Sequence, residues 1–430
     1  PVAIDLFSEN ISYEAHTCVD DFDLVREDGK NYFYGTYGCD SPVESIHSLF
    51  QYLVQLEHQP EFQIILGDTA SHCAYSIEHL LYVMDIAGGL FRSYYPKIPF
   101  IVTLGNNDVY PHNSLPVGSS EMLTGLAKVW RKHDLLPEAS LQQFEKAGFY
   151  SLTISPKLKI ISLNTLYYYS TWCDTNTTET TCHDFEYSPD PAGQFTWLTD
   201  ELNHSRDINQ QVYIIGHVGP QCSHSTKKML WVEIYSNKFS QIVDNYKEVI
   251  SSLFFSHVHR DTMNLILRDN NGEIFAPQRG REALTNLGIY NQQTIIIPPA
   301  VSPNSRQNPS FRQVFFDESY SLVDYSQYYF LLNETQSKEF GLPEWKLEYS
   351  FAEAFDVSDL SPENMFDVFL RLQSDQSLLE VWKRFHVAES DAVDDYDTIN
   401  DEMLLCSMAG FCNYVAPCLA NEIAKNETLQ

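Results

Sequence analysis

The sequence predicts an α/β fold built from βαβ units, with a helical region at its C-terminal end. Short apolar runs rich in β-branched residues recur along the first 255 residues, and each stops at Gly, Asn, Asp or Ser. Such runs are typical of buried strands. Segments with helical spacing separate the early runs, and this alternation indicates a largely parallel sheet.

The individual elements follow from this pattern. The expected strands are residues 2–4, 62–66, 100–104, 159–163, 212–215 and 253–255. The expected helices between the early strands are residues 43–56, 77–91 and 121–133, whose apolar side chains recur at helical spacing.

The pattern changes after residue 255. Residues 264–267 and 294–297 are strand-like runs, and the loop 298–309 follows the second of them. Because a turn-rich stretch separates these two runs, we expect them to form a second sheet.

The C-terminal part of the chain is expected to be mainly helical. Residues 366–385 and 397–423 have largely helical patterns, and the second of them contains three clustered cysteines. We therefore expect one large domain at residues 1–345 and a helical, cysteine-containing subdomain at residues 346–430 that packs on it.

The composition excludes several kinds of partner. Lys and Arg number 27 against 58 Asp and Glu, which gives a formal net charge of −31 and a pI near 4.6. A surface this acidic repels polyanions, so we expect no nucleic acid or anionic membrane as a partner. The chain has no run of 18 or more apolar residues, so no stable membrane insertion is expected.

Cysteines and glycosylation signals favour the secretory route. The nine cysteines show no C-x-x-C pair and no zinc-finger spacing, so disulfides are expected, with at least one thiol left over. The N-x-S/T sequons predict N-glycans at Asn10, Asn176, Asn203, Asn333 and Asn426. The chain lacks an initiator Met and a signal peptide, so we expect a mature protein that is secreted or lies in the lysosomal lumen.

Ligand-type side chains recur at the carboxyl ends of the expected strands, where open α/β sheets build their sites. They are Asp5, Asp68 in ILGDTASH, Asn106 in VTLGNND, His217 in YIIGHVGP, and His257 with His259 in FFSHVHRD. Each motif alone is a common turn or loop feature. Together they supply the oxygen and imidazole ligands that two divalent ions require.

The order and spacing of these residues resemble the calcineurin-like metallophosphoesterases, and within them the acid sphingomyelinase-like phosphodiesterases. The segments that carry the closer resemblance are KAGFYSL, LKIISLNT, VYIIGHVGP, HRD, PPAVSPN, YYFLLNET and WKLEYSF. They span nearly the whole chain. The resemblance implies a four-layer α/β/β/α sandwich and a hydrolase that uses one or two zinc ions.

The resemblance also assigns roles to residues. One ion would be held by Asp5, Asp68 and His259, and the other by Asp68, Asn106, His217 and His257. Two such ions bind phosphate oxygens and activate water for attack on phosphorus. His72, four residues after Asp68, matches a histidine that this branch places beside the leaving group.

Two positions depart from the family pattern and leave enzymatic activity an open question. The first motif, Asp-x-His in the family, reads Asp5-Leu6-Phe7 here, so one ligand is lost unless Ser8 or Glu9 replaces it. Asn107 stands where the family has a catalytic histidine. An amide can donate a hydrogen bond to a phosphate oxygen, but it cannot supply a proton. His112, in the loop after Asn107, is either a surface histidine or a further neighbour of the site.

Two functions remain open from the sequence. The first is a metal-dependent phosphodiesterase that acts slowly on a small soluble or headgroup phosphoester. The second is an inactive, secreted glycoprotein with a binding or structural role, whose partner is a protein. The aromatic cluster Tyr167, Tyr168, Tyr169 and Trp172 either lines a substrate cleft or packs in the core.

Overall fold

The structure is a computed structural model of the 430-residue chain. It describes the backbone of residues 4–5 and all atoms of residues 32–72, 74–170, 188–222, 229–277, 282, 284, 287–337, 342–392 and 400–410. The sequence expectations for Phe7, Ser8, Glu9, Trp172 and the sequons at Asn10, Asn176 and Asn426 lie outside the described residues.

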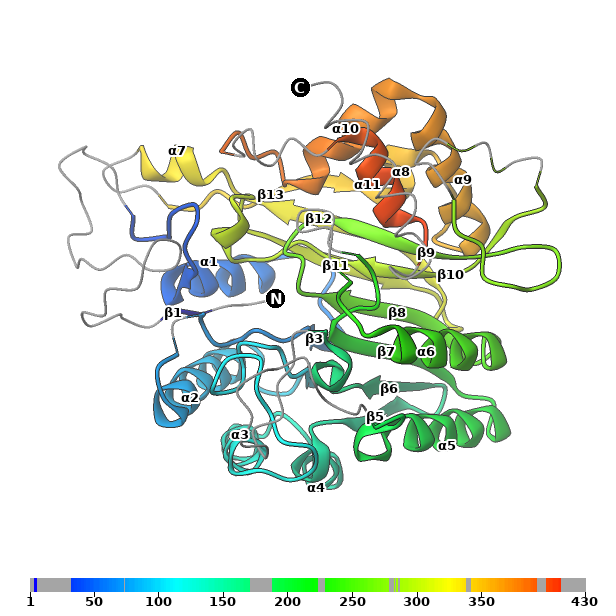
Figure 1. The fold of residues 1–430 in the computed structure, drawn as a ribbon. Coiled ribbons are helices and arrows are strands. Elements are labelled where there is room, and N and C mark those ends of the chain that lie inside the picture. Colours follow the sequence, from blue (N-terminus) through cyan, green and yellow to red (C-terminus); the bar gives the residue numbers. More distant parts are fainter. Residues whose placement is uncertain are drawn as a thin grey trace.

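The main sheet has six strands in the order β5-β6-β7-β8-β10-β9 (Figure 1). Their bounds are Tyr150–Ser155, Leu158–Ser162, Gln211–Val218, Ile250–Ser256, Tyr290–Ile297 and Thr262–Arg268 in that order. The central strands β6, β7, β8 and β10 are parallel, and the edge strands β5 and β9 pair antiparallel. Strands β6 and β9 are buried at every residue, as expected of strands covered on both faces.

Two short parallel pairs continue the strand arrangement beside the main sheet. They are β1 (Ile4–Asp5) with β2 (Ser41–Pro42), and β3 (Gln63–Ile65) with β4 (Phe100–Val102). Helix α1 (Val43–Leu53) follows β2, and α2 (Ile77–Tyr94) connects β3 to β4. This confirms the βαβ pattern expected from the sequence.

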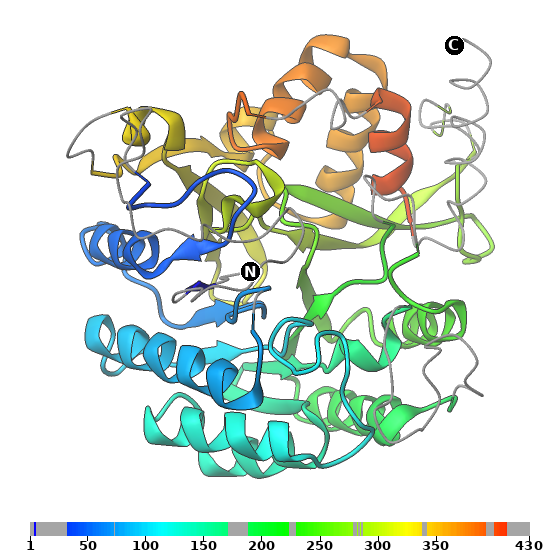
Figure 2. The ribbon, with the colours of Figure 1, turned by 60° about the vertical axis from the view of Figure 1, so that its left-hand side comes forward.

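Helices cover the strands on both sides. Helices α3 (Glu121–Lys132) and α4 (Glu138–Ala147) follow β4, while α5 (Gln194–Asp207) precedes β7 and α6 (Glu233–Asn245) precedes β8. In Figure 2, the blue and cyan helices α1–α4 lie on one side of the strands and the green helices α5 and α6 on the other. The predicted α/β class is therefore confirmed.

Local sequence signals determine where several helices begin and end. The hydroxyl of Ser76 accepts the backbone N–H of His79 and begins α2, and Ser120 does the same for Leu123 in α3. Gly148 ends α4 with φ of +79°, a left-handed conformation that glycine adopts without strain.

The second sheet lies at a different place from the one expected. Residues 264–267 and 294–297 do form strands, β9 and β10, but both join the main sheet, so that expectation was wrong. The apolar residues of β10 are buried on both faces, because this strand pairs with β8 as well as β9. The actual second sheet contains β11 (Ser310–Phe316), β12 (Leu322–Tyr329) and β13 (Lys346–Ser350), all antiparallel.

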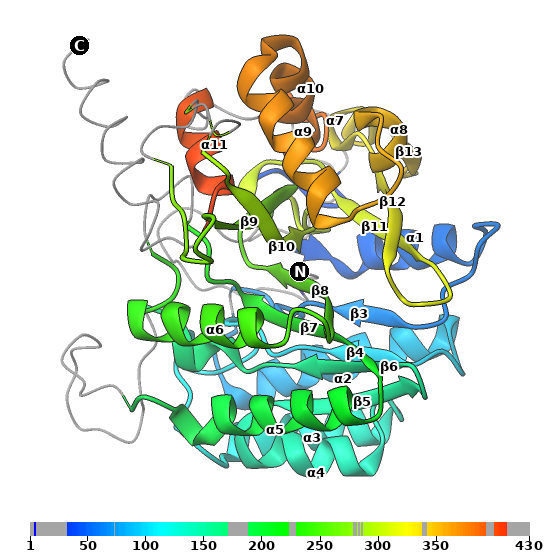
Figure 3. The same ribbon diagram turned by 90° about the vertical axis from the view of Figure 1, so that its right-hand side faces the viewer.

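The C-terminal region is helical, as expected. It contains α8 (Phe351–Phe355), α9 (Pro362–Ser374), α10 (Gln376–His386) and α11 (Asp401–Met408), and the short α7 (Leu332–Gln336) lies between β12 and β13. Figure 3 shows α9 and α11 beside the main sheet, where they contact β10 and β9. A domain boundary at residue 345 stays a prediction. Among the described residues, no helix is long and apolar enough to cross a membrane.

A buried ionic cluster joins the main sheet to the second sheet. Arg312 of β11 forms an ion pair with Asp261, and the two side chains are 3% and 1% exposed. The guanidinium also donates to Gln327 and lies over the ring of Tyr325, 3.9 Å from its centroid. Asp261 additionally accepts a hydrogen bond from the hydroxyl of Tyr349. The loop that precedes β9 is thereby fixed to β11, β12 and β13.

Loss of Arg312 is expected to destabilise the protein strongly. In Arg312→Met, Asp261 would stay buried without its counter-ion, which typically costs about 3–5 kcal/mol of unfolding free energy. Lys247→Met is the control, because Lys247 and its partner Asp244 are 56% and 40% exposed and such pairs contribute about 0–1 kcal/mol. Chemical denaturation of both variants measures the difference. Equal losses would show that the cluster adds no more than a surface pair.

Candidate functional site

The sheet brings together four of the side chains that the sequence singled out. Asp68 and Asn106 follow β3 and β4, His217 lies near the end of β7, and His257 comes directly after β8. Ligand atoms of Asp68, His217 and His257 all lie within 4.8 Å of one another. Because these strands are parallel, their carboxyl ends meet at one edge, as predicted.

His217 is held so that one ring nitrogen faces two oxygen atoms. Its Nδ1 lies 2.7 Å from the carbonyl oxygen of Leu66, which accepts only a donated hydrogen and so fixes the proton on Nδ1. Nε2 then carries a lone pair. It lies 3.0 Å from Asp68 Oδ2 and 2.9 Å from Asn106 Oδ1. With Nε2 unprotonated, three acceptor atoms face one another in a buried site, an arrangement that a cation between them would stabilise.

Asn106 completes this group of acceptors. Its Oδ1 also lies 2.9 Å from Nδ1 of His257, while its Nδ2 donates to Nε2 of His112 at 2.6 Å. His112 thus sets the orientation of the amide so that the oxygen faces the histidines. This answers the question left open for His112, which lies against the site although its residue is largely exposed.

The geometry of this group fits a metal ion. Atoms that bind zinc at about 2.0–2.2 Å lie roughly 3.3 Å apart in a tetrahedral arrangement. The separations of 2.9 and 3.0 Å around His217 Nε2 are within a few tenths of an ångström of that value. Asp68, Asn106, His217 and His257 are therefore the residues that could hold one divalent ion.

The backbone of the site is unusual at the same residues. Asp68, His257 and His259 have φ values of +52°, +74° and +63°. Residues other than glycine adopt the left-handed region infrequently, although Asp and His do so more often than most, and each such residue costs on the order of 1–3 kcal/mol. Strain of this size persists only where the surrounding structure enforces it, and it is typical of functional sites.

Glycine allows the loops after β3 and β4 to approach closely. A Cβ atom on Gly105 would lie 2.1 Å from the backbone nitrogen of Asp68, so no other residue fits there. The carboxylate of Asp108 then joins the two loops, since it accepts the backbone N–H groups of Gly105, Asp68 and Ala70 at 2.7, 2.8 and 2.9 Å.

Asn107, which replaces the family histidine, is directed at Asp68. Its backbone N–H donates to Asp68 Oδ1 at 2.8 Å, and its side-chain Nδ2 donates to Asp68 Oδ2 at 3.0 Å. The residue is 2% exposed. Its amide therefore supports the carboxylate that was predicted to bridge two ions.

The second predicted ion position is only partly described. His259 is 7% exposed and its Nδ1 lies 3.0 Å from the hydroxyl of Ser305, which leaves Nε2 as its ligand atom. Asp5 is the last residue of β1, and its Cα pairs with that of Pro42. Its side chain lies outside the described atoms, so a complete second ion site stays a prediction.

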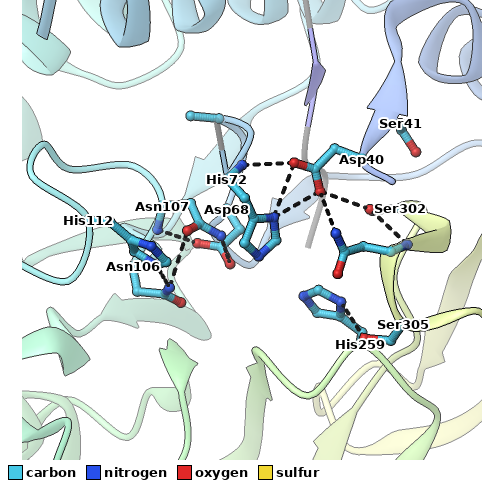
Figure 4. A network of polar contacts seen from close by, with 12 residues as sticks. Asp40, Ser41, Asp68, His72, Asn106, Asn107, His112, His259, Ser302 and Ser305 are labelled. Carbon is cyan, nitrogen blue, oxygen red and sulfur yellow. Dashed lines mark hydrogen bonds and ion pairs between the residues drawn. The ribbon is translucent and has the colours of Figure 1, made fainter. Parts of the chain in front are cut away.

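His72 lies beside this centre and is paired with an aspartate that the sequence did not single out. Figure 4 shows its ring between Asp40 and Asp68. Nδ1 of His72 lies 2.9 Å from Asp40 Oδ1. The ring centroids of His112 and His259 are 6.1 and 6.0 Å from that of His72. No sequence motif around Asp40 marks it as a residue of the site.

Burial and charge shift the pKa values of the site in opposite directions. Burial would raise the pKa of Asp68, but the charge and hydrogen bond of a protonated His217 bring it far below its usual range, and a cation in the place of that proton would act in the same direction. Burial lowers the pKa of His257 to about 3 and that of His259 well below 6.5. Burial and the charge of Asp68 raise the pKa of Asp108 to about 6. Neutral histidines beside an ionised carboxylate form a set that binds cations.

The aromatic cluster divides into core and site residues. Tyr167 and Tyr168 are fully buried, and Tyr168 stacks on Phe195 with 4.6 Å between the ring centroids. Both therefore pack in the core. Tyr169 is half-buried, and its ring meets that of His257 edge-on at 5.2 Å. Only Tyr169 of these three lies next to the site.

Two protein-family models match this sequence. The sequence matches the calcineurin-like phosphoesterase family over residues 35–261 and the acid sphingomyelin phosphodiesterase C-terminal region over residues 289–411. The first match covers the loops that carry Asp68, Asn106, His217, His257 and His259. The second covers the second sheet and the C-terminal helices.

Several curated proteins are similar over most of their length. Human cyclic GMP-AMP phosphodiesterase SMPDL3A is 31% identical over 84% of this chain and 76% of its own. Human acid sphingomyelinase-like phosphodiesterase 3b is 30% identical, over 88% of this chain and 78% of its own. Sphingomyelinase phosphodiesterase C of Dictyostelium discoideum is 29% identical, over 87% of this chain and 80% of its own.

Among solved structures, a dimetal phosphatase from Danio rerio matches 66% of this chain and 84% of its own, with 11% identity and a TM-score of 0.38. The sequence matches carry the assignment. The chain belongs to the calcineurin-like phosphoesterase family, in its acid sphingomyelinase-like branch.

Proposed function

We propose that this protein is a metal-dependent phosphodiesterase that hydrolyses a phosphoester bond in a small soluble or headgroup substrate. The observation that carries the proposal is the position of His217 Nε2, which lies 3.0 Å from Asp68 Oδ2 and 2.9 Å from Asn106 Oδ1. A cation would stabilise three acceptors at this separation, and His72 lies beside them to supply a proton. The relatives named above are phosphodiesterases by name.

The residues have separate tasks in this proposal. A bound divalent ion would bind a phosphate oxygen and lower the pKa of a water molecule. His217, His257 and Asn106 would hold that ion, with Leu66 and His112 fixing their orientation. His72 would protonate the leaving oxygen.

We propose zinc as the ion, because two imidazole nitrogens and a carboxylate suit it. We expect zinc to bind first at the position formed by Asp68, Asn106, His217 and His257. The position near His259 is expected to bind more weakly, since Phe7 offers no donor atom where the family has histidine. A single-ion enzyme of reduced activity is therefore the form of the proposal that fits these residues best.

One observation favours the alternative, a binding glycoprotein without catalysis. Both donors of Asn107 are directed at Asp68, at 2.8 and 3.0 Å, so this amide supports a ligand instead of the leaving group. In this alternative the ion has a structural role, and a protein partner replaces the substrate.

The names of the relatives suggest the class of substrate. One is named a cyclic GMP-AMP phosphodiesterase and another a sphingomyelinase phosphodiesterase, so we propose a phosphodiester as the substrate class. The half-buried ring of Tyr169 beside His257 is suited to contact either a base or a choline headgroup.

We further propose that the protein follows the secretory route to the cell exterior or the lysosomal lumen. Two of its sequons lie on the described surface. Asn333 is exposed in α7 and contacts Asp391 at 2.7 Å, and Asn203 is half-buried in α5. The net charge of −31 would fall in an acidic compartment, which reduces self-repulsion there.

Metal content tests the site itself. The purified protein is expected to contain about one zinc ion per chain, and His217→Ala is expected to lose it, because its nitrogen faces both oxygen ligands. Chelation should lower the melting temperature of the wild type and leave that of His217→Ala unchanged. His204→Ala, an exposed residue of α5, is the control that keeps the ion. Equal zinc in all three proteins would place the metal elsewhere.

Restoring the family histidine tests whether catalysis survives. Wild type is expected to hydrolyse methyl phenyl phosphate, whose leaving oxygen needs a proton, slowly between acidic and neutral pH. Asn107→His should raise the rate by about 10-fold or more, because a second proton donor typically contributes roughly 10²–10⁴. Asn107→Ala is the control without a donor. No turnover by wild type above His217→Ala would support the inactive glycoprotein instead.

Glycan occupancy tests the secretory route. Protein recovered from the medium of secreting cells should lose mass on enzymatic deglycosylation. Asn333→Gln should shift the untreated protein by the mass of one glycan, because the residue is exposed in α7. Asn304→Gln is a suitable control, since this asparagine precedes Ser305 and Arg306 and is not part of a sequon. An unmodified Asn333 in secreted protein would contradict the assignment.

A further inference from the structure

Asp40 has both carboxylate oxygens directed at a single residue, His72. Oδ2 accepts the backbone N–H of His72 at 2.8 Å, and Oδ1 lies 2.9 Å from its ring Nδ1. The side chain of Asp40 has no exposed surface, and that of His72 is 22% exposed. A buried carboxylate is expensive to desolvate, so a contact of this kind must offset that cost.

Residues distant in the sequence also hold Asp40 in place, in addition to its contacts with His72. The hydroxyl of Ser302 and the amide of Asn304 approach Oδ1 at 3.4 and 3.5 Å. The neighbouring Ser41 donates to the carbonyl oxygen of Val301 at 3.0 Å. The loop before β2 is therefore docked on the turn that also carries Ser305, the partner of His259.

We propose that Asp40 is a positioning residue for His72, holding its ring so that Nε2 faces the phosphoester site as a proton donor. This inference rests on the proposed phosphodiesterase function and deepens it. The carboxylate accepts Nδ1–H, which fixes the orientation of the ring and directs Nε2 away from Asp40. Figure 4 shows the consequence, with the ring between Asp40 and the Asp68 group.

The chemical step balances with one water molecule. The oxygen of water forms a bond to phosphorus while the bond from phosphorus to the leaving oxygen breaks. The leaving oxygen takes the proton from Nε2 of His72 and departs as an alcohol. The proton released by the attacking water passes to solvent, and His72 regains one from solvent. Asp40 keeps its charge throughout.

A series of leaving groups separates this role from simple loop packing. Methyl aryl phosphates are hydrolysed by wild type, Asp40→Asn and His72→Gln, with aryl groups from p-nitrophenol to phenol. p-Nitrophenolate leaves without a proton, so both variants should stay within about 3-fold of wild type on that ester. On the phenyl ester both should lose roughly 10²-fold, the usual contribution of a proton donor. A loss by Asp40→Asn that is equal on all esters would overturn the proposal.

The double variant and a matched control complete the kinetic test. If Asp40 acts through His72, Asp40→Asn with His72→Gln should be no slower on the phenyl ester than His72→Gln alone. Multiplying losses would mean that Asp40 acts independently, contrary to the proposal. Asp190→Asn is the control, because Asp190 accepts the backbone N–H of Phe195 at 2.7 Å in the first turn of α5. The Asp190→Asn variant should leave the ratio of hydrolysis rates between the esters unchanged.

A second measurement keeps the proposal separate from the proposed function. Nitrogen-15 NMR of labelled histidines, assigned with His72→Gln, should show a proton on Nδ1 of His72 in wild type. In Asp40→Asn the amide can donate to Nδ1, so this proton should be lost. An Nδ1 proton that persists in Asp40→Asn would overturn the positioning role. Absence of turnover on every ester by wild type would refute the enzyme function and leave the NMR result to decide on Asp40.

Discussion

The carboxylate of Asp108 is the contact on which the site depends. It accepts backbone N–H groups of Gly105, Asp68 and Ala70, and so fixes the loops after β3 and β4 at a distance that only Gly105 permits. Its position next to Asp68 places two acidic groups in a buried region, which raises the pKa of Asp108 to about 6. A cation bound there would offset this repulsion, so the contact that positions the two loops also favours the binding of an ion.

The histidines complete this arrangement from the other half of the sheet. Nδ1 of His217 donates to the carbonyl oxygen of Leu66, the residue that follows β3. One hydrogen bond at the centre of the site therefore joins β7 to the end of β3. The loop with His257 and His259 is held from outside by the ion pair of Asp261 with Arg312. Left-handed backbone at both histidines is therefore enforced by contacts to two sheets.

The sequence predicted the parts of this structure that depend on local signals. Asp68, Asn106, His217 and His257 each follow an apolar strand, and a parallel sheet necessarily brings such positions to one edge. Asp40 could not be found in this way, because its contacts lie 32 residues away at His72 and 262 away at Ser302. The expected second sheet failed for the same reason, since β10 pairs with β8, which is distant in the sequence.

Asn107 shows why the two functional alternatives cannot be separated by counting lost residues. Its substitution removes a proton donor, yet its amide now supports Asp68 with two hydrogen bonds. Such support keeps Asp68 ionised and favours a bound cation. The left-handed backbone at Asp68 and His257 is typical of functional sites, and the Asp40–His72 pair supplies the one proton donor that the proposed hydrolysis needs. The two alternatives therefore differ in whether a substrate uses that donor, which the number of lost residues does not decide.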